Sequence, residues 1–119
     1  MSYFTDFAEN ISAGGNVIRR YQQMTKDGEK GGIMYYLQDE AIKTLNEVFG
    51  NGAFSGHQVR PNGGQVKMVK LAIAIIKMTE EEAEEWVKKS AKEAEAQEKN
   101  REAVEKIRKL EYRDEVEGE

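Results

Sequence analysis

Lysine and arginine side chains, with a few aromatic rings between them, are the groups in this 119-residue sequence that could do chemistry. An arginine can bind a phosphate through two N–H groups, and its flat head, like an aromatic ring, can stack on a base. The candidate contacts to a nucleic acid are the cations Arg19, Arg20, Lys30, Lys43, Arg60, Lys67, Lys70 and Lys77 and the rings of Tyr35, Tyr36 and Phe54. The alternative interpretation is that the cations are ordinary surface charges and that the rings pack a sheet.

The residue types needed for catalysis or metal binding are scarce. Without cysteine there is no disulfide, no thiolate nucleophile and no cysteine-bound zinc, and the single histidine, His57, excludes two-histidine metal motifs. Ser55 could hydrogen-bond His57 along a strand, but no GxSxG turn is present, and the glycine-rich stretches match neither GxxxxGK[ST] nor GxGxxG. We therefore predict no catalytic residue, no metal and no cofactor, and a phosphate contact is the functional alternative for His57.

Charge is distributed unevenly along the chain, which has a net charge of −4. Residues 1–78 hold 9 Lys/Arg and 7 Asp/Glu, whereas residues 79–119 hold 9 and 15. A nucleic acid would therefore need a local basic patch rather than bulk positive charge. No apolar run approaches the roughly 18 residues of a membrane span, and the N-terminus lacks the features of a signal peptide. We expect no membrane partner and a cytoplasmic location, or the host cytoplasm for a viral protein.

Apolar spacing predicts the elements of the first two thirds of the chain. In order, they are a short helix over residues 4–11, a second helical stripe over 17–24, a strand over 33–37, a helix over 38–49, and strands over 53–60 and 65–78 joined by a turn at 61–64. The last strand has apolar residues on both faces, which favours a central or covered position. Lys70 interrupts one of those faces, so its side chain must reach solvent or meet an anion.

A long charged helix is predicted for the last third. Thr79 and Glu82 have the spacing of a capping box, and the helix should run from about residue 80 to about residue 108. Residues 113–119 are expected to fray. Together these elements predict a single α+β domain over residues 1–112, in which a small curved antiparallel β-sheet packs against helices.

The segment from Gly31 to Arg60 resembles a signature of the Rad fifty-two family of single-strand annealing proteins and of the related mitochondrial genome maintenance nucleoid protein. The signature consists of a glycine-rich turn, a short strand ending in a Tyr–aliphatic pair, a helix, a Phe-Gly, a further glycine and an aromatic residue. The matching positions are Gly31, Gly32, Tyr36, Leu37, Ala41, Leu45, Asn46, Phe49, Gly50, Gly52 and Phe54. An arginine upstream of the turn corresponds loosely to Arg19 or Arg20.

This resemblance implies binding of single-stranded DNA and annealing of complementary strands without ATP, in recombination or replication. It also implies a homo-oligomer, either a ring or a helix, with DNA in an outer groove. On this interpretation, in a minimal or divergent version of the family, the predicted DNA-binding residues are Arg19, Arg20, Lys30, Tyr36, Lys43, Arg60, Lys67 and Lys70.

Two other functions are open at the level of sequence. The chain could be a homo-oligomeric assembly or protein-interaction module that binds no nucleic acid, which its acidic second half favours. A small nuclease is the remaining alternative, and it lacks a recognisable metal cluster or nucleophile–base pair. Nucleic-acid binding separates the first of these from strand annealing, since both predict assembly.

Overall fold

The computed structural model describes residues 16–60 and 63–115 of the chain. Its elements, in order, are β1 (Val17–Met24), β2 (Lys30–Leu37), α2 (Asp39–Phe49), β3 (Gln58–Val59), α3 (Gln65–Lys77), α4 (Glu80–Ser90), α5 (Ala94–Arg108) and β4 (Glu111–Glu115). The helix predicted over residues 4–11 lies outside the described residues, as do two residues of the turn predicted at 61–64.

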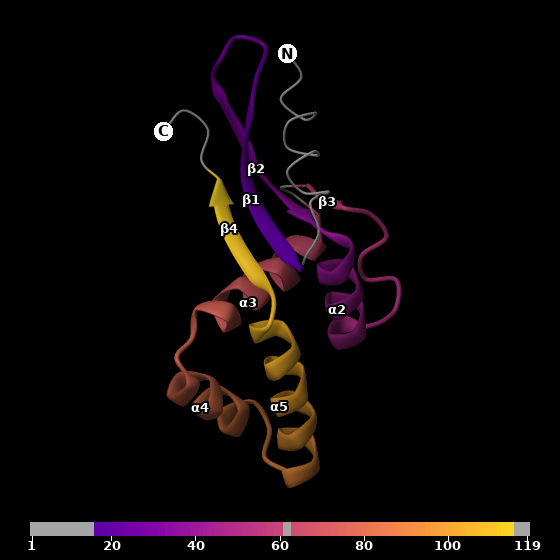
Figure 1. Cartoon of the computed structure of the whole chain (residues 1–119), viewed down its shortest axis with the longest axis vertical. Helices are drawn as coiled ribbons and strands as arrows, with labels where there is room; N and C mark the ends of the chain where they lie inside the picture. Colours follow the sequence, from indigo (N-terminus) through magenta and orange to yellow (C-terminus); the bar gives the residue numbers. More distant parts are fainter. Residues whose placement is uncertain (1–15, 61–62, 116–119) are drawn as a thin grey trace.

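The four strands form one curved, open sheet in the order β3-β2-β1-β4 (Figure 1). β2 pairs antiparallel with both β1 and β3, whereas β4 runs parallel to β1. The predicted α+β class is confirmed. The sheet is mixed rather than wholly antiparallel, because the chain reaches β4 only after crossing over through three helices.

Residues 17–24, predicted as a helical stripe, form strand β1. Ile18 pairs with Leu37 and Tyr21 with Met34 across the β1–β2 ladder. Apolar residues spaced by three or four positions over only eight residues cannot distinguish a helix from a strand that is covered on both faces. The predicted strand over 53–60 is likewise shorter in the structure, where only Gln58 and Val59 pair with β2.

Residues 65–77, predicted as the best strand, form helix α3. Val69, Ala72 and Ile73 are buried, and the intervening Lys70 and Ala74 are exposed, which is the spacing of a helix. A run of valine, isoleucine and alanine is compatible with either structure, and its length of 13 residues favours the helix. Gly63 and Gly64 therefore lead into a helix and not into the second strand of a hairpin.

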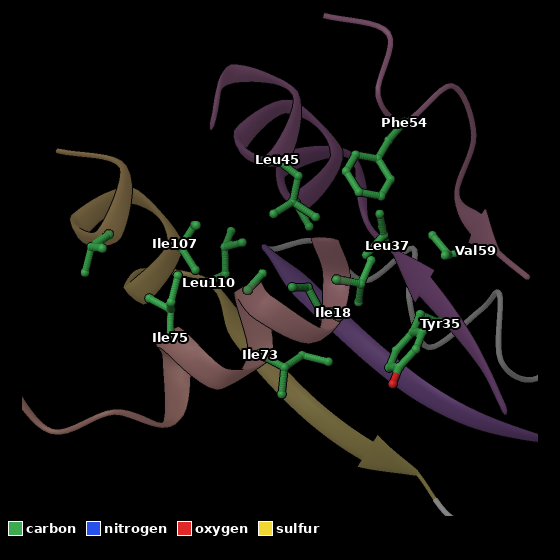
Figure 2. Packing of buried hydrophobic residues seen from close by; sticks show 14 of the residues in the cluster. Ile18, Tyr35, Leu37, Leu45, Phe54, Val59, Ile73, Ile75, Ile107 and Leu110 are labelled. Atoms are coloured by element: carbon green, nitrogen blue, oxygen red, sulfur yellow. The ribbon is translucent and has the colours of Figure 1, made fainter. Parts of the chain in front are cut away.

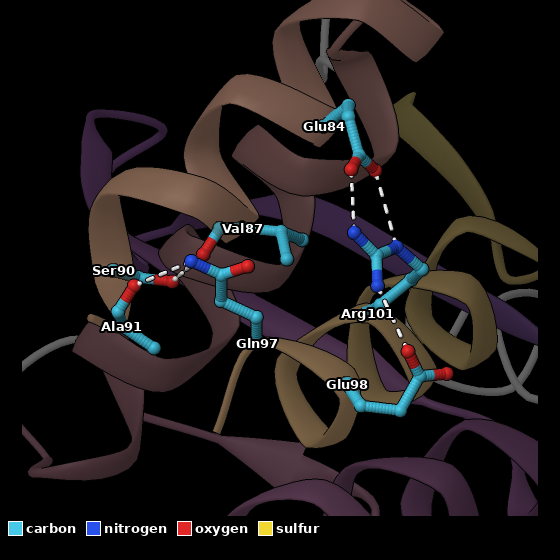
Figure 3. Close-up of polar contacts among 7 residues, drawn as sticks. All are labelled: Glu84, Val87, Ser90, Ala91, Gln97, Glu98 and Arg101. Atoms are coloured by element: carbon cyan, nitrogen blue, oxygen red, sulfur yellow. Dashed lines mark hydrogen bonds and ion pairs between the residues drawn. The ribbon is translucent and has the colours of Figure 1, made fainter. Parts of the chain in front are cut away.

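The predicted long helix over 80–108 is a hairpin of two helices, α4 and α5, with a break at Ala91. The capping box of Thr79 and Glu82 is confirmed, with both reciprocal hydrogen bonds at 3.1 Å. Arg101 of α5 donates two hydrogen bonds to Glu84 of α4 and one to Glu98 (Figure 3). Folding back buries Val87 and Val104, whose sparse apolar stripes could not stabilise one extended helix.

The tail predicted to fray from residue 113 begins instead within a strand. Residues Glu111–Glu115 form β4, and the N–H of Glu111 donates to the carbonyl of Asn16 at 2.9 Å. Val17 to Tyr21 of β1 supply the partner residues, so an edge position in the sheet orders this acidic segment. Residues 116–119 lie outside the described part of the chain.

One hydrophobic core joins the sheet to all four of the described helices. It is built from Ile18, Leu37 and Leu45 together with side chains of α3 and α5, including Ile73, Ile75 and Ile107 (Figure 2). Ile18, Leu37 and Leu45 are completely buried. None of the described helices has the length and apolar character needed to cross a membrane.

The orientation of α3 can be tested with two alanines that a strand would place on the same face. Ala72→Gln puts a polar side chain into the core and should lower the free energy of unfolding by about 3 kcal/mol. The matched variant Ala74→Gln changes an exposed position and should stay within about 0.5 kcal/mol of the wild type. Urea unfolding followed by circular dichroism measures both, and equal losses would contradict the helical orientation.

Candidate nucleic-acid interface

The residues of the signature after α2 form one hydrogen-bonded unit. The side chain of Asn46 accepts a hydrogen bond from the Phe54 N–H at 2.8 Å and donates one to the Phe54 carbonyl at 3.0 Å. Gly50 and Gly52 take positive φ angles of 118° and 84°, which a residue with a Cβ adopts only with strain. Phe54 is buried against the core, so this loop delivers the following residues to the sheet in a fixed position.

That following segment carries His57 to the edge of the sheet. The Leu37 N–H donates to the His57 carbonyl at 2.8 Å, and Gln58 and Val59 then pair with Tyr36 and Tyr35. Val59 is buried on the helix-covered face with Tyr35, whereas Gln58 and His57 are exposed. Among the described strands none lies beyond β3, so these side chains stand at an edge of the described sheet.

Two neighbours hold the imidazole of His57. Its ring stacks on Tyr36, with centroids 5.6 Å apart and planes inclined by 20°. Its Nε2 lies 2.5 Å from Oδ1 of Asp39, the first residue of α2. The prediction that Tyr35 and Tyr36 point to opposite faces is confirmed, because Tyr35 lies in the helix-side core and Tyr36 is half-buried beside His57.

Positive charge gathers on the chain that follows. Between Glu47 and Glu80 the sequence contains no acidic residue and four basic ones. Three of these, Lys67, Lys70 and Lys77, are exposed and share one side of α3, which spans about 15 Å between the first and the last. A strand would have placed Lys67 and Lys70 on opposite faces, so the helix is what brings them together.

Arg60 lies in the chain between the edge strand β3 and helix α3, which carries the three exposed lysines. It follows β3 directly, is exposed, and its carbonyl accepts a hydrogen bond from the Gly63 N–H at 3.1 Å. The chain thus turns from β3 into α3 within a few residues. We call the exposed residues His57, Arg60, Lys67 and Lys70, together with the half-buried Tyr36 that stacks on His57, the β3–α3 surface. Among the described residues, none of the ion pairs involves Arg60, Lys67 or Lys70.

The two ends of α3 differ in which side chains neutralise the helix dipole, and the difference leaves positive charge at the N-terminal end. At the C-terminal end, Nη1 of Arg108 donates to the carbonyl oxygens of Ile75, at 3.1 Å, and of Met78. The negative end of the helix dipole is therefore neutralised by α5. At the N-terminal end there is no side-chain cap and no acidic residue in the first turn, so the positive end of the dipole adds to the field of Lys67.

The paired arginines Arg19 and Arg20 do not act together. Arg20 points to the helix-covered side, where it binds Asp114 of β4 at 2.9 Å, and this hydrogen bond raises its pKa. Arg19 lies on the other face, opposite Tyr36 and Arg113 in the ladders, and is only 2% exposed. Arg19 is thus buried, and the Arg20 side chain, which is 29% exposed, is bound by Asp114 on the opposite face of the sheet.

Two further predicted contacts lie away from the β3–α3 surface. Lys30 begins β2 at the far end of the hairpin, about 20 Å along the strand from Tyr36. Lys43 is exposed on α2, whose buried residues Ala41 and Leu45 face the core. Of the eight predicted residues, Arg60, Lys67 and Lys70 are thus exposed on the segments that follow the sheet edge, and Tyr36 lies on the other face of the sheet, next to Arg19 in the β1–β2 ladder. Arg20, Lys30 and Lys43 lie elsewhere on the fold.

His57, Asp39 and Gln58 lie at this edge of the sheet and were not among the predicted DNA-binding residues. Nothing in the sequence indicates that Asp39 would meet His57, because the two are 18 positions apart and the contact requires β2 and β3 to pair. The absence of acidic residues between Glu47 and Glu80 is the signal that could have selected this region. The hydrogen bond considered between Ser55 and His57 is replaced by the contact with Asp39.

Comparison with known proteins gives no family model that matches, no matching curated protein and no matching solved structure. Within residues 16–60 and 63–115, no group of three or more acidic, histidine or cysteine side chains is arranged to hold a metal ion.

The environment of Tyr112, which includes Arg20 and Asp114, predicts how the free energy of unfolding changes at alkaline pH. Burial and the nearby Asp114 raise the pKa of Tyr112 from 10.0 to about 12, so the folded protein favours the neutral phenol. The stability that this tyrosine contributes is complete below pH 10 and is lost as pH rises towards 12. Tyr112→Phe should therefore lose less stability than the wild type over this range in urea unfolding, with little difference at neutral pH. Parallel curves for the two proteins would contradict the shift.

Proposed function

We propose that this protein binds single-stranded DNA through the β3–α3 surface and anneals complementary strands without ATP, acting as a homo-oligomer. The observation that carries the proposal is the acid-free stretch between Glu47 and Glu80, which folds so that Arg60, Lys67 and Lys70 are exposed on adjoining segments. The resemblance of residues 31–60 to the annealing family supports the same function from the sequence.

The combination of cations and rings favours a single strand over a duplex. Cations alone bind the phosphates of either form, whereas ring stacking requires bases whose faces are open. Tyr36 and His57 form a stacked pair of rings at the edge of the sheet, and Arg60 follows His57 by three positions in the chain. Acidic residues of α4, beginning with Glu80, Glu81 and Glu82, repel phosphates and restrict binding to this side of the molecule.

A single subunit offers only a few phosphate contacts, which makes assembly important for affinity. Each contact to a single strand contributes a slope of about −0.7 to the dependence of log K on log salt. Three cations therefore give a slope of only about −2, which is typical of weak binding at physiological salt. Several subunits on one strand would add avidity without further contacts in each subunit.

Neutralising the helical part of the surface tests this proposal. Lys67→Gln/Lys70→Gln should weaken binding to a fluorescent oligo-dT about tenfold at low salt and reduce the salt slope by about 1.4, because two phosphate contacts are lost. Fluorescence anisotropy at several salt concentrations measures both quantities. Lys88→Gln/Lys89→Gln is the matched control, since it removes the same charge from exposed positions on α4.

The control should bind almost as the wild type does. Equal losses in both double variants would mean that total charge, and not the β3–α3 surface, determines affinity. Absence of binding by the wild type even at low salt would rule out the proposed function. If binding is found, two complementary dye-labelled strands should pair faster with the protein present and ATP absent, as followed by energy transfer.

An assembly module without nucleic-acid binding is the second candidate, and a different feature favours it. Leu71 of α3 is the one exposed large hydrophobic residue among those described. It lines an apolar hollow of about 190 Å³ whose other walls come from the end of α2 and from α3, α4 and α5, including Phe49, Trp86 and Val104. Among the described strands the outer edge of β4 is also unpaired, so two surfaces are suited to contacts with another copy.

Leu71→Gln tests whether this hollow contributes to assembly. Removing the apolar side chain from an exposed position should leave the unfolding midpoint nearly unchanged while shifting the oligomer towards smaller species. Light scattering after size-exclusion chromatography measures the mass. A wild type that is monomeric at all concentrations tested would contradict both the assembly module and the homo-oligomeric part of the proposed function.

A further inference from the structure

His57 is held in one orientation by contacts on two sides. Tyr36 covers one face of the imidazole, and Asp39 binds Nε2 at 2.5 Å. The carboxylate can only accept a hydrogen bond, so Nε2 carries the proton that joins the two side chains. The backbone at this position is fixed as well, because the His57 carbonyl accepts from Leu37. An exposed ring with this many constraints loses little conformational entropy when a ligand is added.

The same ring remains open to solvent on the side away from Tyr36. The His57 side chain is 46% exposed, although one of its faces is stacked. We infer that this free face of His57 is a stacking platform for a base of the bound single strand. This inference rests on the proposed function and adds to it the group that contacts the base.

The surrounding charges define how a strand would lie. Asp39 is strongly exposed next to His57 and repels phosphates, whereas Arg60 stands three positions further along the chain and attracts them. The sugar–phosphate backbone would therefore follow Arg60 and Lys67, and a base would turn inward to cover the imidazole. In this arrangement Asp39 is a positioning residue that orients the ring and does not itself contact the strand.

A role in proton transfer fits these contacts less well. Among the described residues, Asp39 is the polar side chain hydrogen-bonded to the His57 ring, and Tyr36 is the ring that stacks on it. A histidine–carboxylate pair needs a nucleophile or a bound water to act on, and no described hydroxyl is hydrogen-bonded to this imidazole. A planar ring held rigidly three positions before Arg60 is what the geometry provides.

The test compares an oligo-dT with an abasic oligonucleotide that carries the same number of phosphates. Both are measured by anisotropy at one low salt concentration. The wild type should bind the oligo-dT about tenfold more tightly than the abasic strand, because stacking on one base contributes affinity that phosphates cannot supply. His57→Ala should bind the oligo-dT about five- to tenfold more weakly and leave the affinity for the abasic strand unchanged.

Two further variants separate stacking from other roles of His57. His57→Phe keeps a ring without its hydrogen bond to Asp39 and should retain most of the preference for oligo-dT, which also covers the case in which His57→Ala fails to fold. Asp39→Ala frees the imidazole and removes a negative charge. It should raise the affinity for the abasic strand while lowering the ratio of the two affinities, and a purely electrostatic role would leave that ratio constant.

The outcomes distinguish this inference from the proposed function. If the wild type binds neither oligonucleotide, the proposed function fails and the inference fails with it. If the wild type binds both equally, or if His57→Ala weakens both to the same extent, single-strand binding stands and the stacking role is overturned. Loss of the oligo-dT preference in His57→Phe equal to that in His57→Ala would also overturn it.

Discussion

Packing of α3 against the sheet is the interaction on which the rest of this structure depends. Only one side of the helix can be buried, and Val69, Ala72 and Ile73 occupy it, so the lysines must face solvent. The C-terminal end of α3 is closed by Arg108, which ties it to α5. Helix α5 then leads into β4, whose pairing with β1 completes the sheet that α3 covers. Loss of this packing would thus disturb both the core and the basic stripe.

The opposite edge of the sheet depends on a second local unit. Asn46 binds both backbone groups of Phe54, and two glycines with positive φ allow the chain to turn there. This unit places His57 beside Tyr36 and directs the chain through Arg60 into α3. Residues that carry the family resemblance, such as Asn46 and Phe54, therefore have a structural role. They hold the candidate surface in place, and the basic residues of the β3–α3 surface follow them in the chain.

The α4–α5 hairpin and the β3–α3 surface differ in whether their charged side chains form ion pairs with other described residues. In the α4–α5 hairpin, Arg101 is bound by Glu84 and Glu98, an arrangement that lowers the pKa of Glu84 and raises that of Arg101 (Figure 3). On the β3–α3 surface, the cations have no such partners among the described residues. An ion pair within the fold contributes to stability, whereas an exposed cation without an ion pair is available to bind a polyanion. A protein with a net charge of −4 can thus present a basic face.

Local signals in the sequence determined several features without reference to the fold. The Thr79–Glu82 capping box set the start of α4, the acid-free stretch set the sign of charge around α3, and the alternation at Tyr35 and Tyr36 set their opposite faces. Tertiary structure alone decided that residues 17–24 form a strand, that residues 65–77 form a helix, and that the chain reverses at Ala91. Short apolar runs satisfy both periodicities, so the choice depends on which surface is available to cover them. Tertiary structure also decided the pairing of His57 with Asp39, because residues far apart in the sequence meet only when the strands pair in the correct register.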